Sequence, residues 1–289
     1  MSIGSISNIY RYPVKSMAGE TLESVVVGAS GIPGDRAWAV RDEVRGGIRG
    51  GKKFPRLMQF SSCYAETPTD TGSSPAVITL PSGEIADTGD AAINQILSEA
   101  LEHNVSLWPL LSADMLDHYR RGAPEHEDME QELRAMFARE PHEPLPDLSV
   151  FPPELVEFES PPGTYFDAFP ILILSKASLA SMQSACPDSV FDERRFRPNF
   201  LIDNTEAGVE FPEQNWEGRR LQIGSAVLKC EVTCPRCVMT THGFAELPKD
   251  PSIMRSLVAE NGGNLGLYAS VETPGTISAG DQLTLLDKH

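Results

Sequence analysis

Three cysteines and one histidine lie close together around residue 235, and their types suit chemistry with a metal or an electrophile. They are Cys230, Cys234, Cys237 and His242. Residues 221–232 alternate between apolar and polar side chains, which predicts a strand. Pro235 should end the regular pairing, because proline has no N–H to donate. The thiols therefore lie at a strand-to-turn corner beside Arg236, and a nearby cation lowers the pKa of a thiol.

Spacing alone leaves four interpretations of these residues open. The thiols could be buried packing residues, as free cysteines commonly are. The three thiols and His242 could bind zinc, although a structural zinc site generally uses a second ligand pair some distance away, which the chain lacks. One thiolate could bind a soft or redox-active metal and leave other positions to substrate. A thioredoxin-like Cys-x2-Cys is the weakest, because that motif begins a helix and here a strand precedes it.

The size and charge of the chain exclude some functions. Its 289 residues suffice for one large or two ordinary domains. A formal net charge of −17 disfavours a nucleic-acid surface, which needs clustered Lys and Arg. The sequence has no uninterrupted run of about 18 apolar residues, so no membrane span is expected. The N-terminus has no basic start and no long apolar run, and the cysteine count is odd, so we expect reduced thiols in a cytoplasmic protein.

The first part of the chain predicts a mostly β structure with one helix. Apolar residues at helical spacing predict a helix over 91–103. A glycine-rich basic loop is expected over 46–53 and a hairpin over 76–85. Further strands are expected over 3–14, 22–27, 36–40, 57–64 and 105–110.

Residues 118–163 differ from the rest in composition. Eleven acidic residues between Glu125 and Glu159 face only Arg134 and Arg139, and eight prolines lie between Pro124 and Pro162. A surface helix is expected over 127–139. We interpret the remainder as a solvated, mobile or partly ordered linker rather than a partner-binding arm.

Order resumes in the second part. A buried strand is expected over 171–174, followed by a helix over 176–185 with Ser175 as its N-cap. A second helix should begin at Pro251 or Ser252 and end before Gly262. Strands are expected over 200–203, 264–271 and 282–286. Parallel βαβ alternation and a GxGxxG motif are both missing, so a nucleotide-binding Rossmann fold is a poor interpretation.

Five short segments, in order along nearly the whole chain, resemble a known family. Residues 233–241 (TCPRCVMTT), 196–199 (FRPN) and 272–281 (ETPGTISAGD) resemble the MOSC domain, the C-terminal domain of molybdenum cofactor sulfurases. Residues 9–16 (IYRYPVKS) and 34–38 (GDRAW) resemble the β-barrel domain that precedes MOSC in the mitochondrial amidoxime-reducing components. The resemblance implies a mainly β (α+β) fold with two β-barrel domains packed together. It places the N-terminal β-barrel domain at 1–118, the acidic Pro-rich insertion at 119–163 and the MOSC domain at 164–289.

The resemblance also implies a site. Cys237 would be both the catalytic residue and the molybdenum ligand, and a soft sulfur ligand suits such a metal. The implied cofactor-binding residues are Lys15, Ser16, Arg36, Arg197, Asn199, Arg236 and Tyr268. Cys234 is a second candidate thiol. His242, Asp167 and Tyr268 could transfer protons, but spacing does not bring them together. The chain departs from the relatives before Pro170, where Ala168 and Phe169 replace small hydroxyl residues, so contacts there would come from the backbone.

The implied function is an oxidoreductase that uses the molybdenum cofactor (Mo-molybdopterin) to reduce small N-hydroxylated compounds such as amidoximes and hydroxylamines. Electrons would come from a separate flavin or iron–sulfur protein. Pyridoxal phosphate binding is a further expectation attached to the resemblance. Two alternatives remain: a sulfur-carrier module with a persulfide on Cys237 or Cys234, and a zinc-stabilised or unliganded binding module.

Overall fold

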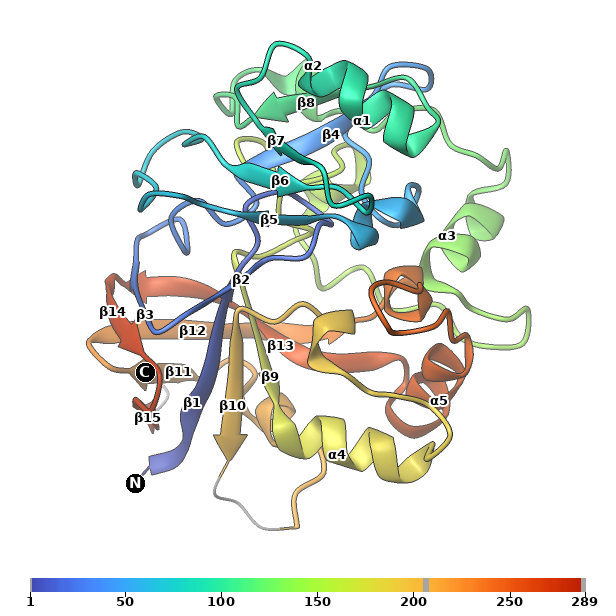
Figure 1. The fold of residues 1–289 in the computed structure, drawn as a ribbon. Coiled ribbons are helices and arrows are strands. Elements are labelled where there is room, and N and C mark those ends of the chain that lie inside the picture. The colour runs from blue at the N-terminus through green and yellow to red at the C-terminus, as the bar shows by residue number, and fades with distance from the viewer. Residues whose placement is uncertain (1, 205–207, 287–289) are drawn as a thin grey trace.

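A closed seven-stranded barrel occupies the lower half of the molecule (Figure 1). The structure is a computed structural model that describes residues 2–204 and 208–286. Within these residues the barrel strands follow the order β10, β9, β13, β12, β11, β15 and β1, and β1 pairs with β10 to close the ring. Their bounds are β1 Ser2–Arg11, β9 Ile171–Ser175, β10 Phe200–Asn204, β11 Arg220–Ile223, β12 Ala226–Pro235, β13 Asn264–Thr273 and β15 Gln282–Leu286.

The first strand of the chain belongs to this barrel and not to the upper half. One edge of β1 pairs with β10, and the other pairs with β15 and then with the short β2 (Glu20–Leu22). Strand β3 (Ser24–Val27) likewise pairs with β14 (Gly275–Ser278). Sheet pairing therefore crosses the division expected near residues 118 and 163, which stays a prediction about separate folding units.

The upper half holds two small antiparallel sheets and a helix (Figure 1). One sheet pairs β4 with β8, and the other joins β5, β6 and β7. Helix α1 (Ile93–Leu101) packs its buried face, including Leu97, into the same core as Trp38 and Phe60. The strand bounds are β4 Trp38–Asp42, β5 Ser61–Cys63, β6 Val77–Thr79, β7 Ile85–Asp87 and β8 Val105–Pro109. The predicted mainly β fold with a few helices is confirmed.

The barrel interior is filled by alternate residues of its strands. Along β12 every second residue is buried, from Ala226 through Leu228 and Cys230 to Cys234. Successive side chains of a strand point to opposite faces, so one set fills the barrel and the other faces outward. The interior set from all strands forms one apolar cluster with Ile173, Trp216 and Leu267.

Helix ends in the second half follow the predicted signals. Helix α4 spans Lys176–Ala185, and the Ser175 side chain accepts a hydrogen bond from the Ser178 N–H. Helix α5 spans Ser252–Asn261 and ends at Gly262, whose φ of 59° is left-handed. Serine satisfies a free N–H at the start of a helix, and glycine adopts the left-handed cap without a Cβ penalty.

Three predicted strands are wrong in part. The run 22–27 is divided between β2 and β3, which pair with β1 and β14. The run 221–232 is a hairpin of β11 and β12, turned at Gly224, where φ is +54° and a Cβ would lie 2.3 Å from the Thr276 carbonyl oxygen. The run 57–64 begins as the 3-10 helix η1 (Pro55–Gln59) and pairs only over β5. A turn glycine inside an apolar run, and a proline at a helix start, were the missed signals.

The predicted helix of the acidic insertion packs onto the rest of the chain, whereas most of the insertion is exposed or half-buried, and its role as a solvated linker stays a prediction. Helix α3 (Met129–Phe137) lies within the predicted 127–139, and α2 (Leu116–Tyr119) and the 3-10 helix η2 (Pro153–Val156) flank it. Glu132 is buried and its Oε1 accepts from Lys53 Nζ at 2.6 Å. Arg139 is 5% exposed and donates to the Phe137 carbonyl. Figure 1 shows α3 on one side of the molecule, near the level where its halves meet.

No helix in the described ranges is long and apolar enough to cross a membrane.

Candidate active site

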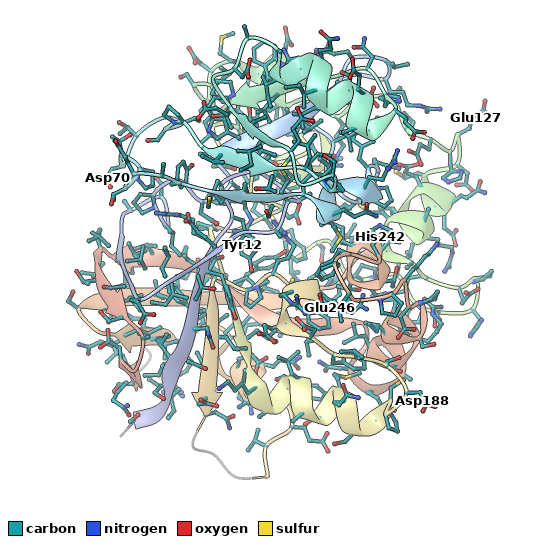
Figure 2. The ribbon with its side chains drawn as sticks, in the orientation of Figure 1. Tyr12, Asp70, Glu127, Asp188, His242 and Glu246 are labelled. Carbon is teal, nitrogen blue, oxygen red and sulfur yellow. The ribbon has the colours of Figure 1, made fainter. Side chains whose placement is uncertain are left out.

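All eight predicted site residues line one pocket between the two halves of the molecule. Lys15, Ser16 and Arg36 come from the chain after β1, and the others come from the second half. Tyr12, labelled in Figure 2, lies at the level where the halves meet. The lining also includes residues that were not predicted, among them Phe169, Leu172, Arg195, Pro235, Met239 and Thr240.

Cys237 stands at the corner that follows β12. It is the N-cap residue of the 3-10 helix η5 (Val238–Thr241). Its carbonyl oxygen accepts from the Thr240 N–H at 3.2 Å and from the Thr240 hydroxyl at 3.0 Å. These bonds fix the backbone, so a half-buried thiol is presented to the pocket from a rigid turn.

The expectation that the cation beside it gives Cys237 a lowered pKa is wrong, because the net shift of that pKa is upward. Burial raises the pKa of the Cys237 thiol, and the cations Lys52 and Arg236 offset this only in part. The Arg236 guanidinium instead donates to Cys234 Sγ at 2.9 Å. Without a metal, Cys237 is therefore held as a neutral thiol, and a bound cationic metal would favour the thiolate.

The zinc interpretation loses its ligand set. Cys230 points into the apolar barrel interior, where burial raises its pKa to about 12. His242 is buried outside the pocket lining. Nowhere in 2–204 or 208–286 do three His, Cys, Asp or Glu side chains gather to hold a metal ion.

Two arginines of the pocket stack on one tyrosine ring. The guanidinium carbons of Arg36 and Arg197 lie 4.8 and 4.2 Å from the Tyr12 ring centroid. Arg36 is paired with Asp35. Arg197 donates to the Met17 carbonyl through Nη1, but its buried Nη2 has no partner among the described residues. Burial lowers the pKa of Arg197 to about 10, so an incoming anion would relieve an unfavourable charge.

Two lysines share one carboxylate at the pocket rim. Lys15 Nζ lies 3.0 Å and Lys52 Nζ 3.3 Å from Asp167 Oδ1, and Lys15 Nζ also donates to the Tyr165 carbonyl at 2.6 Å. Burial opposes the charge on Asp167, but the lysines outweigh it and hold its pKa well below the usual range. Burial lowers the pKa of Lys15 despite Asp167, because Lys15 is the more deeply buried partner.

Strained backbone concentrates at the pocket. Six non-glycine residues in the described chain have positive φ, and three of them, Ser16, Arg36 and Arg197, line the pocket. Such conformations cost roughly 1–3 kcal/mol each and persist where the surroundings impose them. The Ser16 hydroxyl oxygen also accepts from the Gly51 N–H at 2.8 Å, which draws the basic loop towards the pocket. The sequence carried no signal for these conformations.

The remaining predicted residues differ in what holds them. The Asn199 side chain bonds the Leu172 N–H, Asp35 and the Tyr10 carbonyl, so it ties β1 to β9 beside the pocket. Burial raises the pKa of Tyr268 well above its usual value, and Cys234, its side-chain hydrogen-bond partner, adds to this.

The suggested proton-transfer cluster forms only in part. Asp167 and Tyr268 both line the pocket and interact electrostatically, whereas His242 is not in the lining. Of the unpredicted residues, Arg195 donates to the carbonyls of His242 and Thr240 and so braces the turn after Cys237. Lys52 could have been found in the sequence, because it lies in the glycine-rich basic loop.

Comparison with known proteins gives two family matches. The family described as "MOSC domain" matches residues 162–284, and that described as "MOSC N-terminal beta barrel domain" matches residues 3–103. The chain belongs to the MOSC-domain proteins that carry this N-terminal domain. Within them it is related to the mitochondrial amidoxime-reducing components.

The relatives align over nearly the whole chain. Mitochondrial amidoxime-reducing component 1 of Homo sapiens is 28% identical over 98% of this chain and 83% of the relative. Mitochondrial amidoxime reducing component 2 of Bos taurus is 26% identical over 96% of this chain and 82% of the relative. Among solved structures, the YuaD protein from Bacillus subtilis aligns over 98% of this chain and 94% of its own at 13% identity, with a TM-score of 0.43.

Proposed function

We propose that this protein is a molybdenum-cofactor-dependent oxidoreductase that reduces small N-hydroxylated compounds. The observation that carries the proposal is the pocket itself: a rigidly held thiol, Cys237, faces a group of buried cations in a chain of net charge −17. The unpartnered Nη2 of Arg197 is a donor that an anionic cofactor would satisfy. The relatives named as amidoxime-reducing components support the substrate class.

The residues present fit a pterin cofactor that bears a phosphate. In the proposal Cys237 Sγ binds the metal, and buried cations with neighbouring polar groups bind the pterin and its phosphate. These binding residues are Lys15, Ser16, Arg36, Arg197, Asn199, Arg236 and Tyr268. Arginine suits bidentate phosphate contacts and lysine acts as a point charge. When bound, the molybdenum centre would supply two-electron redox chemistry at a position open to an oxygen-bearing substrate.

The rest of the reaction needs protons and electrons from elsewhere. Reduction of R–NH–OH to R–NH2 and water breaks the N–O bond and consumes two electrons and two protons. Lys52 holds a proton beside the pocket: burial opposes the charge on its ammonium group, but the neighbouring Asp167 carboxylate raises its pKa. A separate flavin or iron–sulfur protein would supply the electrons.

Two further expectations are treated differently. Pyridoxal phosphate is not part of the proposal, because Lys15 and Lys52 are both ion-paired with Asp167 and a Schiff base needs a free lysine amine. A cytoplasmic location stays a prediction from the N-terminal sequence, and the relatives are named mitochondrial.

Elemental analysis tests the proposal. The protein would be produced in a host that makes the molybdenum cofactor, together with Cys237→Ala and the matched control Cys63→Ala, whose thiol is exposed. We expect about one molybdenum per chain in the wild type and the control. In Cys237→Ala we expect both the molybdenum and the reduction of benzamidoxime to be lost. Stoichiometric zinc, or labile sulfur without molybdenum, would reject the proposal and favour the structural or the sulfur-carrier alternative.

A further inference from the structure

Three aromatic rings from three separate segments meet at the pocket. Phe169, just before β9, and Tyr268 on β13 both line the pocket, with ring centroids 5.6 Å apart. The ring centroid of Phe151, from the acidic insertion, lies 6.4 Å from that of Phe169 and 6.3 Å from that of Tyr268. Phe151 and Tyr268 meet edge to face. These separations and tilts are those that aromatic pairs prefer. We call the three rings the aromatic wall.

The insertion is held in place on both sides of Phe151. Before it, Glu143 Oε2 pairs with Arg255 Nη1 at 2.5 Å, which ties the insertion to α5. After it, Ser160 Oγ accepts from Lys15 Nζ at 3.5 Å, which ties the insertion to the chain after β1. Between these anchors Val150 is 52% exposed, whereas Phe151 packs inward on the wall. The acidic insertion thus contributes an aromatic side chain that packs on two residues of the pocket lining.

The wall contrasts with the rest of the lining. Around Cys237 the pocket is cationic and hydrogen-bonding, which suits a cofactor and the N–O group. An apolar face at its side suits a flat ring, because apolar pockets with a few polar groups bind by burying flat surface and orienting the reacting end. Neither Phe169 nor Phe151 is among the site residues that the resemblance implies.

We infer that the aromatic wall selects aryl N-hydroxylated substrates, with Phe169 contacting the substrate ring and Phe151 acting as a positioning residue that holds Phe169 and Tyr268. This inference rests on the proposed function and deepens it. Loss of one aromatic packing partner changes affinity by about three- to tenfold. The effect should fall on KM and not on kcat, because the wall binds ground state and transition state alike.

Substrate pairs separate this inference from a general structural role. The variants are Phe151→Ala, the conservative Phe151→Leu, and Val150→Ala as a control for a neighbouring exposed residue. KM and kcat would be measured with benzamidoxime and with acetamidoxime, together with molybdenum per chain. We expect Phe151→Ala to raise KM for benzamidoxime about three- to tenfold, with acetamidoxime within twofold. Phe151→Leu should recover part of the loss, and Val150→Ala should match the wild type.

Other outcomes have distinct meanings. An equal change for both substrates would overturn the inference and leave Phe151 a structural residue. A fall in molybdenum content with unchanged KM would overturn it in favour of a wall that stacks on the pterin. If the wild type reduced neither substrate, the proposed function would fail, and calorimetry with benzamidine and acetamidine would test the wall alone. If the wild type bound benzamidine more tightly than acetamidine and Phe151→Ala did not, the inference about the aromatic wall would be supported. Equal affinity of the wild type for both amidines would reject it.

Discussion

The barrel interior and the pocket at its rim are both buried, yet they are built from opposite materials. The interior is a continuous apolar cluster that includes Ile173, Leu228 and Leu267, each with no exposed surface. The pocket buries cations, among them Arg197 with a guanidinium nitrogen that lacks a partner in the described chain, and three of its residues have left-handed backbone. Apolar burial stabilises the fold, whereas buried unsatisfied charge destabilises it. The comparison indicates that apolar burial in the barrel offsets the free-energy cost of the buried cations and strained backbone at the pocket.

Strand β12 passes from one environment to the other. Cys230 lies in the interior and Cys237 lies just past the end of the strand, at the pocket. The same residue type is a packing group in one place and a candidate ligand in the other. Removing a side chain should therefore affect stability in the interior and chemistry at the rim.

The largest expected effect is on chemistry. Cys237→Ala should reduce reduction of benzamidoxime to the background rate, because it removes the only metal ligand we propose, while the free energy of unfolding changes by less than about 1 kcal/mol. Steady-state assays and urea unfolding would check both. Activity above background in a metal-loaded variant would contradict the role of Cys237.

The second effect is on stability alone. Leu228→Ala should lower the free energy of unfolding by about 3 kcal/mol through lost burial and a cavity. Its kcat at a temperature where it stays folded should match the wild type. A lower kcat in the folded variant would mean that the interior and the pocket are coupled.

A change in the pocket should affect both properties. Arg236→Lys keeps the charge but cannot bridge Cys234 Sγ and the Phe196 carbonyl as the guanidinium does. We expect a loss of about 2 kcal/mol of unfolding free energy and less molybdenum per chain. The control Arg194→Lys lies on the surface with Asp192 and Glu246 and should change neither. Equal molybdenum content in the wild type, Arg236→Lys and Arg194→Lys would show that the Arg236 guanidinium is not needed for cofactor binding.

The smallest effect is on pH dependence. Because the folded-state pKa of Asp167 is lowered, its contribution to stability is present above about pH 4 and is lost as the pH falls through the folded value. Asp167→Asn should therefore melt below the wild type at pH 7, and the difference should shrink in acid. Melting temperatures from pH 7 to pH 2 would show this, and a constant difference would assign the effect to packing.

Local signals predicted much of the fold and none of the strain. The caps at Ser175 and Gly262 and the turn at Pro235 depend on neighbouring residues, so the sequence revealed them. The packing of two insertion residues was not predicted because it depends on distant partners: Glu132 gains Lys53, and Arg139 packs beside Met254. Composition alone reads such residues as solvated.

The site divides along the same line. Residues in matching motifs were predicted and lie around one pocket, whereas Asp167 as the carboxylate shared by two lysines, and the packing of Phe151 on Phe169, arise only from the tertiary fold. Phe169 was noticed only as a departure from the relatives.

The place of β1 in the barrel also bears on how the chain is made. Residues 2–11 leave the ribosome well before their barrel partners β10 and β15, and β15 ends at Leu286. At about 5–20 residues per second, this strand waits roughly 15 to 60 s for its last partner. During that time its N–H and C=O groups are open to other chains, a condition that promotes aggregation. Rapid synthesis or chaperone binding would shorten this exposure, and a fragment cut after residue 163 would keep β1 paired with β2 but without β10 and β15.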